Sequence, residues 1–344
     1  KIFNAMSDTL VRRGPDSCGA YISKNVALIH RRLAVVDLEG GAQPMYKTYN
    51  EREYIIVYNG ELYNSDDLRT ELSEYGISFN SHSDTEVVLS SYIIWGDKCP
   101  EHLNGIFAFA IYDKHRRRLF CARDRAGVKP FFYHMGNDGF IFGSEISTLL
   151  SHPSVPHTID SNGIGEIFLI GPGRTPGHSA FSAIAELKPG EYAVYDESGF
   201  KKQAYWELKA AEHTDTPEET AEHIRFLLTD SIKRQLVSDV PLCCFLSGGL
   251  DSSIISSVAA SEYQKSNHTL TTYSVDYVDN EKYFKANAFQ PNSDDHYIDI
   301  MSKSIGSRHN KVILDNIDVA DALYPATLAR SLPGMAEVDS SLLV

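Results

Sequence analysis

Residues 240–258, VPLCCFLSGGLDSSIISSV, decide the fold of the second half of the chain. The apolar run at 240–246 predicts a buried strand, and residues 250–258 predict a helix. Between them, Gly248 and Gly249 can take positive φ and lack a Cβ, so their N–H groups can close on an anion at the start of that helix. The stretch therefore predicts a phosphate-binding turn between a strand and a helix.

The polar side chains of this turn suit a nucleotide. Ser247, Ser252 and Ser253 add hydroxyl donors, while the Gly-Lys-Ser/Thr ending of a Walker A loop and the glycine spacing of a dinucleotide fingerprint are absent. We therefore expect phosphate binding without a dedicated lysine. Asp251 either caps the helix or acts through a divalent cation, and we favour the cation because a bare carboxylate would repel phosphate. An isolated Ser-Gly-Gly is more often an ordinary turn, but the strand and helix around this one favour the functional interpretation.

Composition limits the partners. Lys and Arg number 32 against 46 Asp and Glu, so the net charge is 32 − 46 = −14, which opposes a polyanion and argues against a nucleic-acid partner. No apolar run is long enough to cross a membrane. The five cysteines are an odd number without metal-ligand spacing, which predicts reduced thiols in a cytoplasmic protein. A length of 344 residues predicts two domains that act on small substrates.

The first half of the chain is rich in strands. Strand patterns occupy 19–29, 54–59, 105–113, 118–124, 130–133, 140–144 and 190–196, with helices at 65–72 and 83–95. A strand is expected to end at Asn59-Gly60. Residues 83–86 are expected to cap a helix, and a role for Asp84 as a simple cap is compatible with a functional role. The polar, proline-punctuated stretch at 210–217 predicts a linker, so we place the boundary between domains 1–208 and 209–344. A second buried strand at 270–276 completes a strand–helix–strand unit and predicts a parallel sheet.

Several short motifs follow one another along the first half of the chain. They are RGPD at 13–16, RLAVVD at 32–37, GAQP at 41–44, NGELYN at 59–64, SDTE at 83–86 and ARDRAGVKP at 122–130. These motifs resemble the glutaminase domain of the N-terminal-nucleophile amidotransferases, and Ser247 to Ser253 resembles the pyrophosphate loop of the N-type ATP pyrophosphatases. Together they resemble the glutamine-hydrolysing asparagine synthetases over essentially the whole chain. This resemblance implies an α+β domain of four αββα layers, followed by a Rossmann-like α/β domain.

For the first domain, the resemblance implies a site for glutamine. Arg32 would pair with the α-carboxylate, a role suited to a guanidinium fork. Glu61 and Asp84 would hold the α-ammonium group. The Asn59 side-chain amide and the Gly60 N–H would form the oxyanion hole for amide hydrolysis.

For the second domain, the resemblance implies an ATP site. Ser247, Gly248, Gly249, Ser252 and Ser253 would hold the phosphates, and Asp251 would bind Mg²⁺ or order the loop. The backbone near Phe245 and Val275 would contact adenine. A homodimer is compatible with the family.

The implied reaction is glutamine-dependent synthesis of asparagine. Glutamine is hydrolysed through a cysteinyl thioester, ATP activates aspartate as an acyl-adenylate, and ammonia, passing through an internal tunnel, displaces AMP. The family's nucleophile is an N-terminal cysteine, whereas this sequence opens at Lys1. We expect a short preceding segment to carry it, expect further synthetase residues after Val344, and assign Cys18 no role.

Two alternatives stay open. The first is a related amidotransferase that acts on another carboxylate. A β-lactam synthetase is disfavoured, because an intramolecular cyclase does not need a complete glutamine-binding set. The second is a non-catalytic or regulatory ATP-binding homologue, which the absence of the cysteine from the gene would favour.

Overall fold

The computed structural model describes residues 1–286 and 292–344. The chain forms two compact units, which are described separately. Unit 1 comprises residues 1–210 together with 330–334, and unit 2 comprises residues 211–329 together with 335–344. The short segment 330–334 thus belongs to the first unit although it follows most of the second in sequence.

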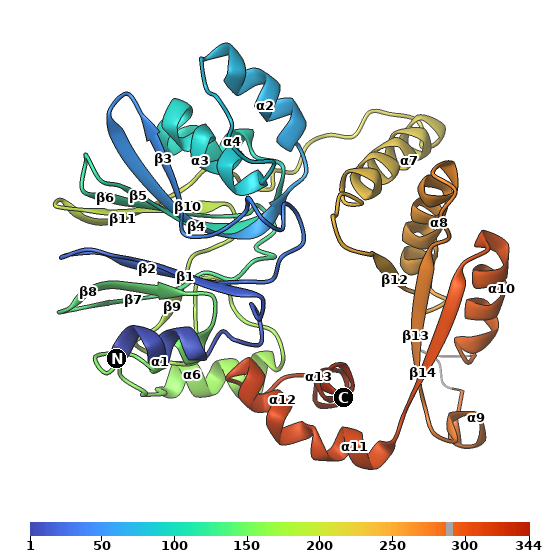
Figure 1. Ribbon diagram of the computed structural model, residues 1–344. Coiled ribbons are helices and arrows are strands. Elements are labelled where there is room, and N and C mark those ends of the chain that lie inside the picture. Colours follow the sequence, from blue (N-terminus) through green and yellow to red (C-terminus); the bar gives the residue numbers. More distant parts are fainter. Residues whose placement is uncertain (287–291) are drawn as a thin grey trace. The chain divides into compact units, whose positions relative to one another are not determined.

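A six-stranded antiparallel sheet forms the centre of unit 1 (Figure 1). Its two middle strands, β5 and β6, are buried along nearly their whole length. In spatial order the strands are β11 (Gly199–Ala204), β10 (Glu191–Asp196), β6 (Arg118–Arg123), β5 (Gly105–Asp113), β4 (Arg52–Leu62) and β3 (Met45–Tyr49).

A second β layer packs on one face of this sheet. It contains the pair β1 (Ser17–Ile22) and β2 (Ala27–Arg32), and the three-stranded sheet β8 (Gly139–Gly143), β7 (Phe132–Gly136) and β9 (Ala185–Glu186). Alternation along β4 sorts its side chains, because successive residues of a strand point to opposite faces. Ile55 and Val57 pack toward β2 and β7, while Ile56 and Tyr58 pack toward the helices on the other face.

Helices cover both outer faces of unit 1 (Figure 1). On the large sheet lie α2 (Ser65–Glu74) and α3 (Asp84–Trp95), followed by η1 (Gly96–Lys98) and α4 (Cys99–His102). The second layer is covered by α1 (Ile2–Asp8) and α5 (Ile146–Leu150), and the chain continues through α6 (Ser161–Gly165) and the π-helix η2 (Glu166–Ile170). The order helix, sheet, sheet, helix confirms the predicted αββα arrangement.

Unit 2 is built on a parallel sheet, which confirms the predicted α/β class. The strands β12 (Cys243–Phe245), β13 (Thr271–Tyr277) and β14 (Arg308–Leu314) lie in that order. Helix α8 (Leu250–Lys265) connects the first two strands, and α10 (Asp295–Ile305) lies between the last two. The remaining helices are α7 (Pro217–Arg234), α9 (Asn280–Tyr283), α11 (Asn316–Asp321), α12 (Leu323–Arg330) and α13 (Ala336–Leu343).

Two predictions about strands are wrong. The strand of residues 240–246 was expected to be buried, but β12 is an edge strand, and its alternation leaves Cys243 exposed and Phe245 68% exposed. Only Cys244 packs on the core formed with α8. The strand expected to end at Asn59-Gly60 continues to Leu62, because β5 pairs with β4 up to that residue.

No helix among the described residues is long and apolar enough to span a membrane.

Candidate active site

Unit 1 contains a cavity of about 740 Å³ whose wall includes every residue predicted to bind glutamine. The cavity lies where β2, β4 and the start of α3 approach one another. Arg32 ends β2, the next three predicted residues follow each other on β4, and Asp84 is the first residue of α3. The predicted residues in the wall are Arg32, Asn59, Gly60, Glu61 and Asp84.

The backbone of β4 presents an N–H group to this cavity. Phe107 lies opposite Gly60 on β5, but its N–H donates to Asp124 Oδ2 at 3.2 Å and its carbonyl accepts from the Asp124 N–H at 2.8 Å. Gly60 and Phe107 therefore form a non-hydrogen-bonded pair. The N–H groups of Tyr58 and Leu62, two residues to either side, also turn away from β5 and donate to side chains at 2.6 and 3.0 Å. The Gly60 N–H therefore points to the same side, and no described group accepts from it.

Gly60 also has a steric reason to be glycine. A Cβ at this position would lie 2.4 Å from the carbonyl oxygen of Ile106 and 2.9 Å from Phe107 Cα, so any other residue would push β4 and β5 apart. The neighbours of Gly60 are Asn59 and Glu61. Their side chains lie on the same face of β4 as that of Val57, which packs toward the second β layer. The amide of Asn59 has no hydrogen-bond partner among the described side chains, so its donors are available to a ligand.

Two carboxylates lie together at the cavity. Asp84 Oδ2 accepts hydrogen bonds from the Tyr58 hydroxyl and from the Leu62 N–H, both at 3.0 Å. Burial raises the pKa of the Asp84 carboxyl, and the negative charge of nearby Glu61 adds to that rise, while these two hydrogen bonds oppose it. In the part of the chain that the structure describes, no lysine or arginine forms an ion pair with either acid. A bound cation would relieve this repulsion.

Arg32 places a positive charge on the cavity wall. Its guanidinium donates to three carbonyl oxygens, those of Leu38 at 3.0 Å, Val36 at 2.8 Å and Asp37 at 2.7 Å. These contacts fix the side chain, which is 8% exposed, without neutralising its charge. Because a guanidinium has five N–H donors, two remain for a ligand. Gly41 makes room for it, since a Cβ there would lie 2.1 Å from Arg32 Nη2.

Ser83, not Asp84, is the N-cap of α3. The Ser83 side chain accepts from the Thr85 N–H at 3.3 Å. The reading of Asp84 as a simple helix cap is therefore wrong, because the preceding serine takes that role and leaves the Asp84 carboxylate to the cavity.

Two residues that the sequence analysis did not single out position β4. Gln43 Oε1 accepts from the Tyr58 N–H at 2.6 Å, and its Nε2 donates to the Tyr58 carbonyl at 3.0 Å. His30 Nε2 donates to the same carbonyl at 3.0 Å, which requires the proton on Nε2. Burial is the main reason that the pKa of His30 falls to about 4, so the ring is neutral. Gln43 lies within the quoted motif at 41–44, but nothing in the motif shows where its amide points.

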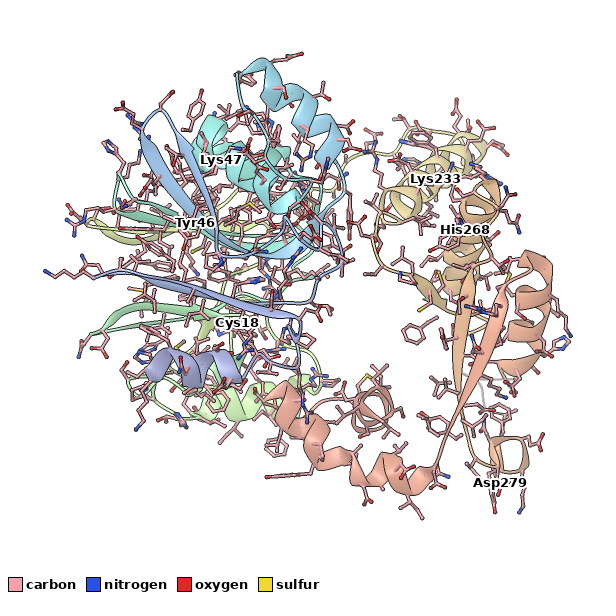
Figure 2. The ribbon with its side chains drawn as sticks, in the orientation of Figure 1. Cys18, Tyr46, Lys47, Lys233, His268 and Asp279 are labelled. Atoms are coloured by element: carbon pink, nitrogen blue, oxygen red, sulfur yellow. The ribbon has the colours of Figure 1, made fainter. Side chains whose placement is uncertain are left out.

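Cys18 lies outside this site. It is an exposed residue of β1, labelled in Figure 2, with its sulfur 3.6 Å from Ser7 Oγ. It is absent from the cavity wall.

In unit 2, the predicted phosphate loop connects β12 to α8. Gly248 has φ +77°, and a Cβ on it would lie 3.0 Å from the Asp294 carbonyl oxygen, so both its backbone conformation and its packing favour glycine. Ser252 closes the loop, because its Oγ lies 3.2 Å from the Ser247 N–H and donates to the Gly249 carbonyl at 3.1 Å.

The backbone around this loop fits an anion. The first helical hydrogen bond runs from the Ser253 N–H to the Gly249 carbonyl, and no described group accepts from the N–H groups of residues 248–252. These donors at a helix N-terminus are suited to phosphate. Gly249 is the N-cap of α8, so Asp251 does not cap this helix. The Asp251 side chain is exposed. No cluster of three or more His, Cys, Asp or Glu side chains that could hold a metal ion occurs among the described residues.

The two residues predicted to contact adenine lie on adjacent strands. Phe245 ends β12 beside Tyr273, and Val275 lies two residues further along β13, near the carboxyl edge of the parallel sheet. They are 68% and 42% exposed, which leaves this edge open to a ligand.

Comparison with known proteins shows the family of the chain. Residues 1–206 match the family model described as Glutamine amidotransferase domain, and the chain belongs to that family. Residues 223–344 match the model described as Asparagine synthase. The resemblance predicted from the ordered motifs is thereby confirmed.

The curated relatives carry matching names. Asparagine synthetase [glutamine-hydrolyzing] 3 of Bacillus subtilis is 50% identical over 339 residues, which cover 98% of this chain and 55% of the relative. Asparagine synthetase [glutamine-hydrolyzing] 1 of the same organism is 33% identical, over 80% of this chain and 42% of its own length. Amidase chry2 of Gibberella zeae is 30% identical, over 74% and 38% respectively. The chain thus spans about half the length of the curated relatives it matches.

Proposed function

We propose that this chain takes part in the glutamine-dependent, ATP-dependent amidation of aspartate to asparagine. The observation that carries the proposal is the charge layout of the unit 1 cavity. The Arg32 guanidinium, the Glu61 and Asp84 carboxylates and the Gly60 N–H share its wall, and none of the three charged groups forms an ion pair with another described residue, which matches an α-amino acid whose side chain ends in a carbonyl. The asparagine synthetases among the relatives support the product.

In unit 1, glutamine would bind with its α-carboxylate on Arg32 and its α-ammonium between Glu61 and Asp84. Its side-chain carbonyl would then reach the Gly60 N–H and the Asn59 amide. These donors stabilise negative charge on that oxygen when a thiolate adds to the carbon, and again when water attacks the resulting thioester. Ammonia is the leaving group of the first step, and glutamate is the product of the second.

In unit 2, the N–H groups of residues 248–252 would hold the phosphates of ATP, with adenine beside Phe245 and Val275. A carboxylate is a poor electrophile, so the side chain of aspartate must first take AMP from ATP, which releases pyrophosphate. Ammonia then attacks the acyl carbon and AMP leaves. The hydroxyls of Ser247, Ser252 and Ser253 line the same turn and would add donors to the departing pyrophosphate.

Asp251 is the residue that would hold Mg²⁺. The fit is partial, because the carboxylate is exposed beside the phosphate donors but belongs to no described cluster of three or more His, Cys, Asp or Glu side chains, so phosphate oxygens would complete the shell. Bound there, the cation would neutralise phosphate charge. ATP, reduced cysteines and small substrates are all consistent with a cytoplasmic enzyme, which we include in the proposal.

Binding of glutamine tests the first half of the proposal without requiring hydrolysis. Calorimetry should show glutamine binding to the chain, and Arg32→Met should weaken it at least about thirty-fold, the effect of truncating one partner of a buried charge pair. Arg52→Met is the matched control, since Arg52 is exposed at the far end of β4. Equal affinities in wild type and Arg32→Met would contradict the assignment.

Exchange of labelled pyrophosphate into ATP tests the second half in the intact protein. Aspartate should support exchange, and Asp251→Ala should reduce it while leaving glutamine binding unchanged. Exchange with another carboxylic acid but not with aspartate would overturn the acceptor. One of the relatives is named an amidase and not an asparagine synthetase, so a different acceptor is a reasonable alternative to test.

A further inference from the structure

Asp37 connects Arg32 to the loop that precedes α3. Its backbone carbonyl accepts from Arg32 Nη2 at 2.7 Å and from the Gly41 N–H at 3.0 Å. The residue has φ +50°, a left-handed conformation that is uncommon outside glycine, and its side chain folds back so that Oδ1 accepts from the Gly40 N–H at 2.8 Å. One end of Asp37 therefore holds the guanidinium.

The other end of Asp37 reaches the loop that carries Asp84. Its Oδ2 accepts from the His82 N–H at 2.8 Å. His82 immediately precedes Ser83, the N-cap of α3, so the carboxylate lies at the positive end of the helix. Although burial raises it, the N–H groups of Gly40, His82 and Ser83 lower the pKa of the Asp37 carboxyl below its ordinary value, so the group is ionised at neutral pH.

We propose that Asp37 is a positioning residue that fixes the spacing between Arg32 and Asp84, so that both charged groups of one α-amino acid can be bound at once. The inference rests on the proposed function of the cavity. Arg32 and Asp84 belong to different elements, β2 and α3, and Asp37 bonds to Arg32 itself and to the residue two positions before Asp84.

The loop before α3 has other supports, so removing the carboxylate should loosen this link and not unfold the loop. Arg69 donates to the Ser81 carbonyl at 3.0 Å and to the Ser83 carbonyl at 2.8 Å. Glu86 accepts from the Ser81 N–H at 2.8 Å. These contacts approach the loop independently of Asp37.

The expected signature is a loss of affinity that depends on the ligand. Glutamine must contact Arg32 and Asp84 at the same time, so its affinity depends on the distance between them. A ligand with one charge contacts only one of these residues and can shift with it. Glutaramate keeps the carboxylate and the amide but lacks the ammonium group, and 4-aminobutanamide keeps the ammonium group and the amide but lacks the carboxylate. A general distortion of the cavity would weaken all three ligands alike.

The test compares Asp37→Asn with Glu39→Gln in the same loop. Both remove one negative charge, but Glu39 is exposed, and no described group hydrogen-bonds to it. Titrations followed by ligand NMR should show glutamine binding about tenfold weaker in Asp37→Asn, with both analogues changed by less than about twofold. Glu39→Gln should match wild type. Asp37→Gly, which keeps the left-handed backbone without strain, should repeat the pattern if the asparagine variant folds poorly.

Two results would overturn the inference. One is unchanged glutamine affinity in Asp37→Asn and Asp37→Gly. The other is an equal loss for glutamine and both analogues. If wild type itself fails to bind glutamine, the proposed function falls and the inference falls with it, so the two failures are distinguishable.

Discussion

Lys47 of β3 and Glu86 in the first turn of α3 form a buried ion pair. The substitution Glu86→Gln should therefore strongly destabilise unit 1. The Lys47 Nζ lies 2.6 Å from Glu86 Oε1, and the two side chains are 9% and 5% exposed. Glu86 also accepts from the N–H groups of Asn80 and Ser81, so it joins β3, α3 and the loop between α2 and α3. Lys47 is labelled in Figure 2.

The magnitude follows from what the substitution leaves behind. Removing one partner of a buried pair costs about 3–5 kcal/mol, because the other charge stays buried without compensation. Lys47 keeps its hydrogen bond to the Ser78 carbonyl at 2.7 Å, so we expect the lower end, about 3 kcal/mol. For a unit of this size, 1 kcal/mol shifts the melting temperature by about 2–4 °C, so the midpoint should fall by about 6–12 °C.

Tryptophan fluorescence can follow this unit selectively. The sequence has two tryptophans, Trp95 and Trp206, and both belong to unit 1. Urea and thermal unfolding should be measured for wild type, Glu86→Gln, Lys47→Met and the double variant. Glu74→Gln, at the exposed end of α2, is the control and should change stability by less than about 0.5 kcal/mol. The double variant should be less destabilised than the sum of the single variants, because no charge remains buried alone.

The pH dependence gives an independent check. Although burial raises it, hydrogen bonds from Lys47, Ser81 and Asn80 lower the pKa of Glu86 below its ordinary value of 4.5. The stabilisation is therefore present above pH 4.5 and is lost as the pH falls through the lower pKa of the folded state, so wild type and Glu86→Gln should converge in acid. A loss below about 0.5 kcal/mol at pH 7, or strictly additive single variants, would refute the reasoning.

Two further predictions concern His30 and the phosphate loop. Burial lowers the pKa of His30 from 6.5 to about 4, so the unfolded chain takes up a proton in this range that the folded chain does not. Unit 1 should lose up to about 3 kcal/mol as the pH falls from 6.5 to 4, and His30→Gln should remove most of that slope in fluorescence unfolding. Gly248→Ala should weaken a fluorescent ATP analogue about tenfold through backbone strain, whereas Gly165→Ala, whose added Cβ meets nothing within 4 Å, should bind it as wild type does.

The strands of unit 1 and the parallel sheet of unit 2 could be predicted because their signals are local, whereas the four αββα layers were implied by the family resemblance. The buried stretches of β4 and β5 show in the sequence as short apolar runs, and the turn before α8 combines glycines with a following helix. The Asn59-Gly60 pair led to the wrong prediction of where β4 ends, because a turn signal depends only on the backbone preferences of two residues. Whether the strand stops there depends on the partner strand, and β5 supplies pairing up to Leu62.

The groups that hold the site together could not be predicted. Gln43 bonds to the backbone of Tyr58, and Asp37 bonds to that of His82, across 15 and 45 residues of sequence respectively. A side chain that bonds to a distant backbone group leaves no periodic pattern, and almost any residue can supply the backbone partner. The exposure of Phe245 was missed for a related reason, because an apolar strand has the same pattern at the edge of a sheet and at its centre.

The charge balance of the unit 1 cavity bears on how the proposed reaction would end. Among the five residues predicted to bind glutamine, one guanidinium against two carboxylates gives 1 − 2 = −1, and both carboxylates lie at the end that would hold the α-ammonium group. Glutamine adds no net charge, since its α-groups cancel and its amide is neutral. Hydrolysis converts that amide into a carboxylate next to Gly60, one residue from Glu61, where partial burial strengthens repulsion between like charges. The arrangement that accommodates a neutral side chain in the substrate therefore disfavours the anionic side chain of the product, and glutamate should leave more readily than glutamine.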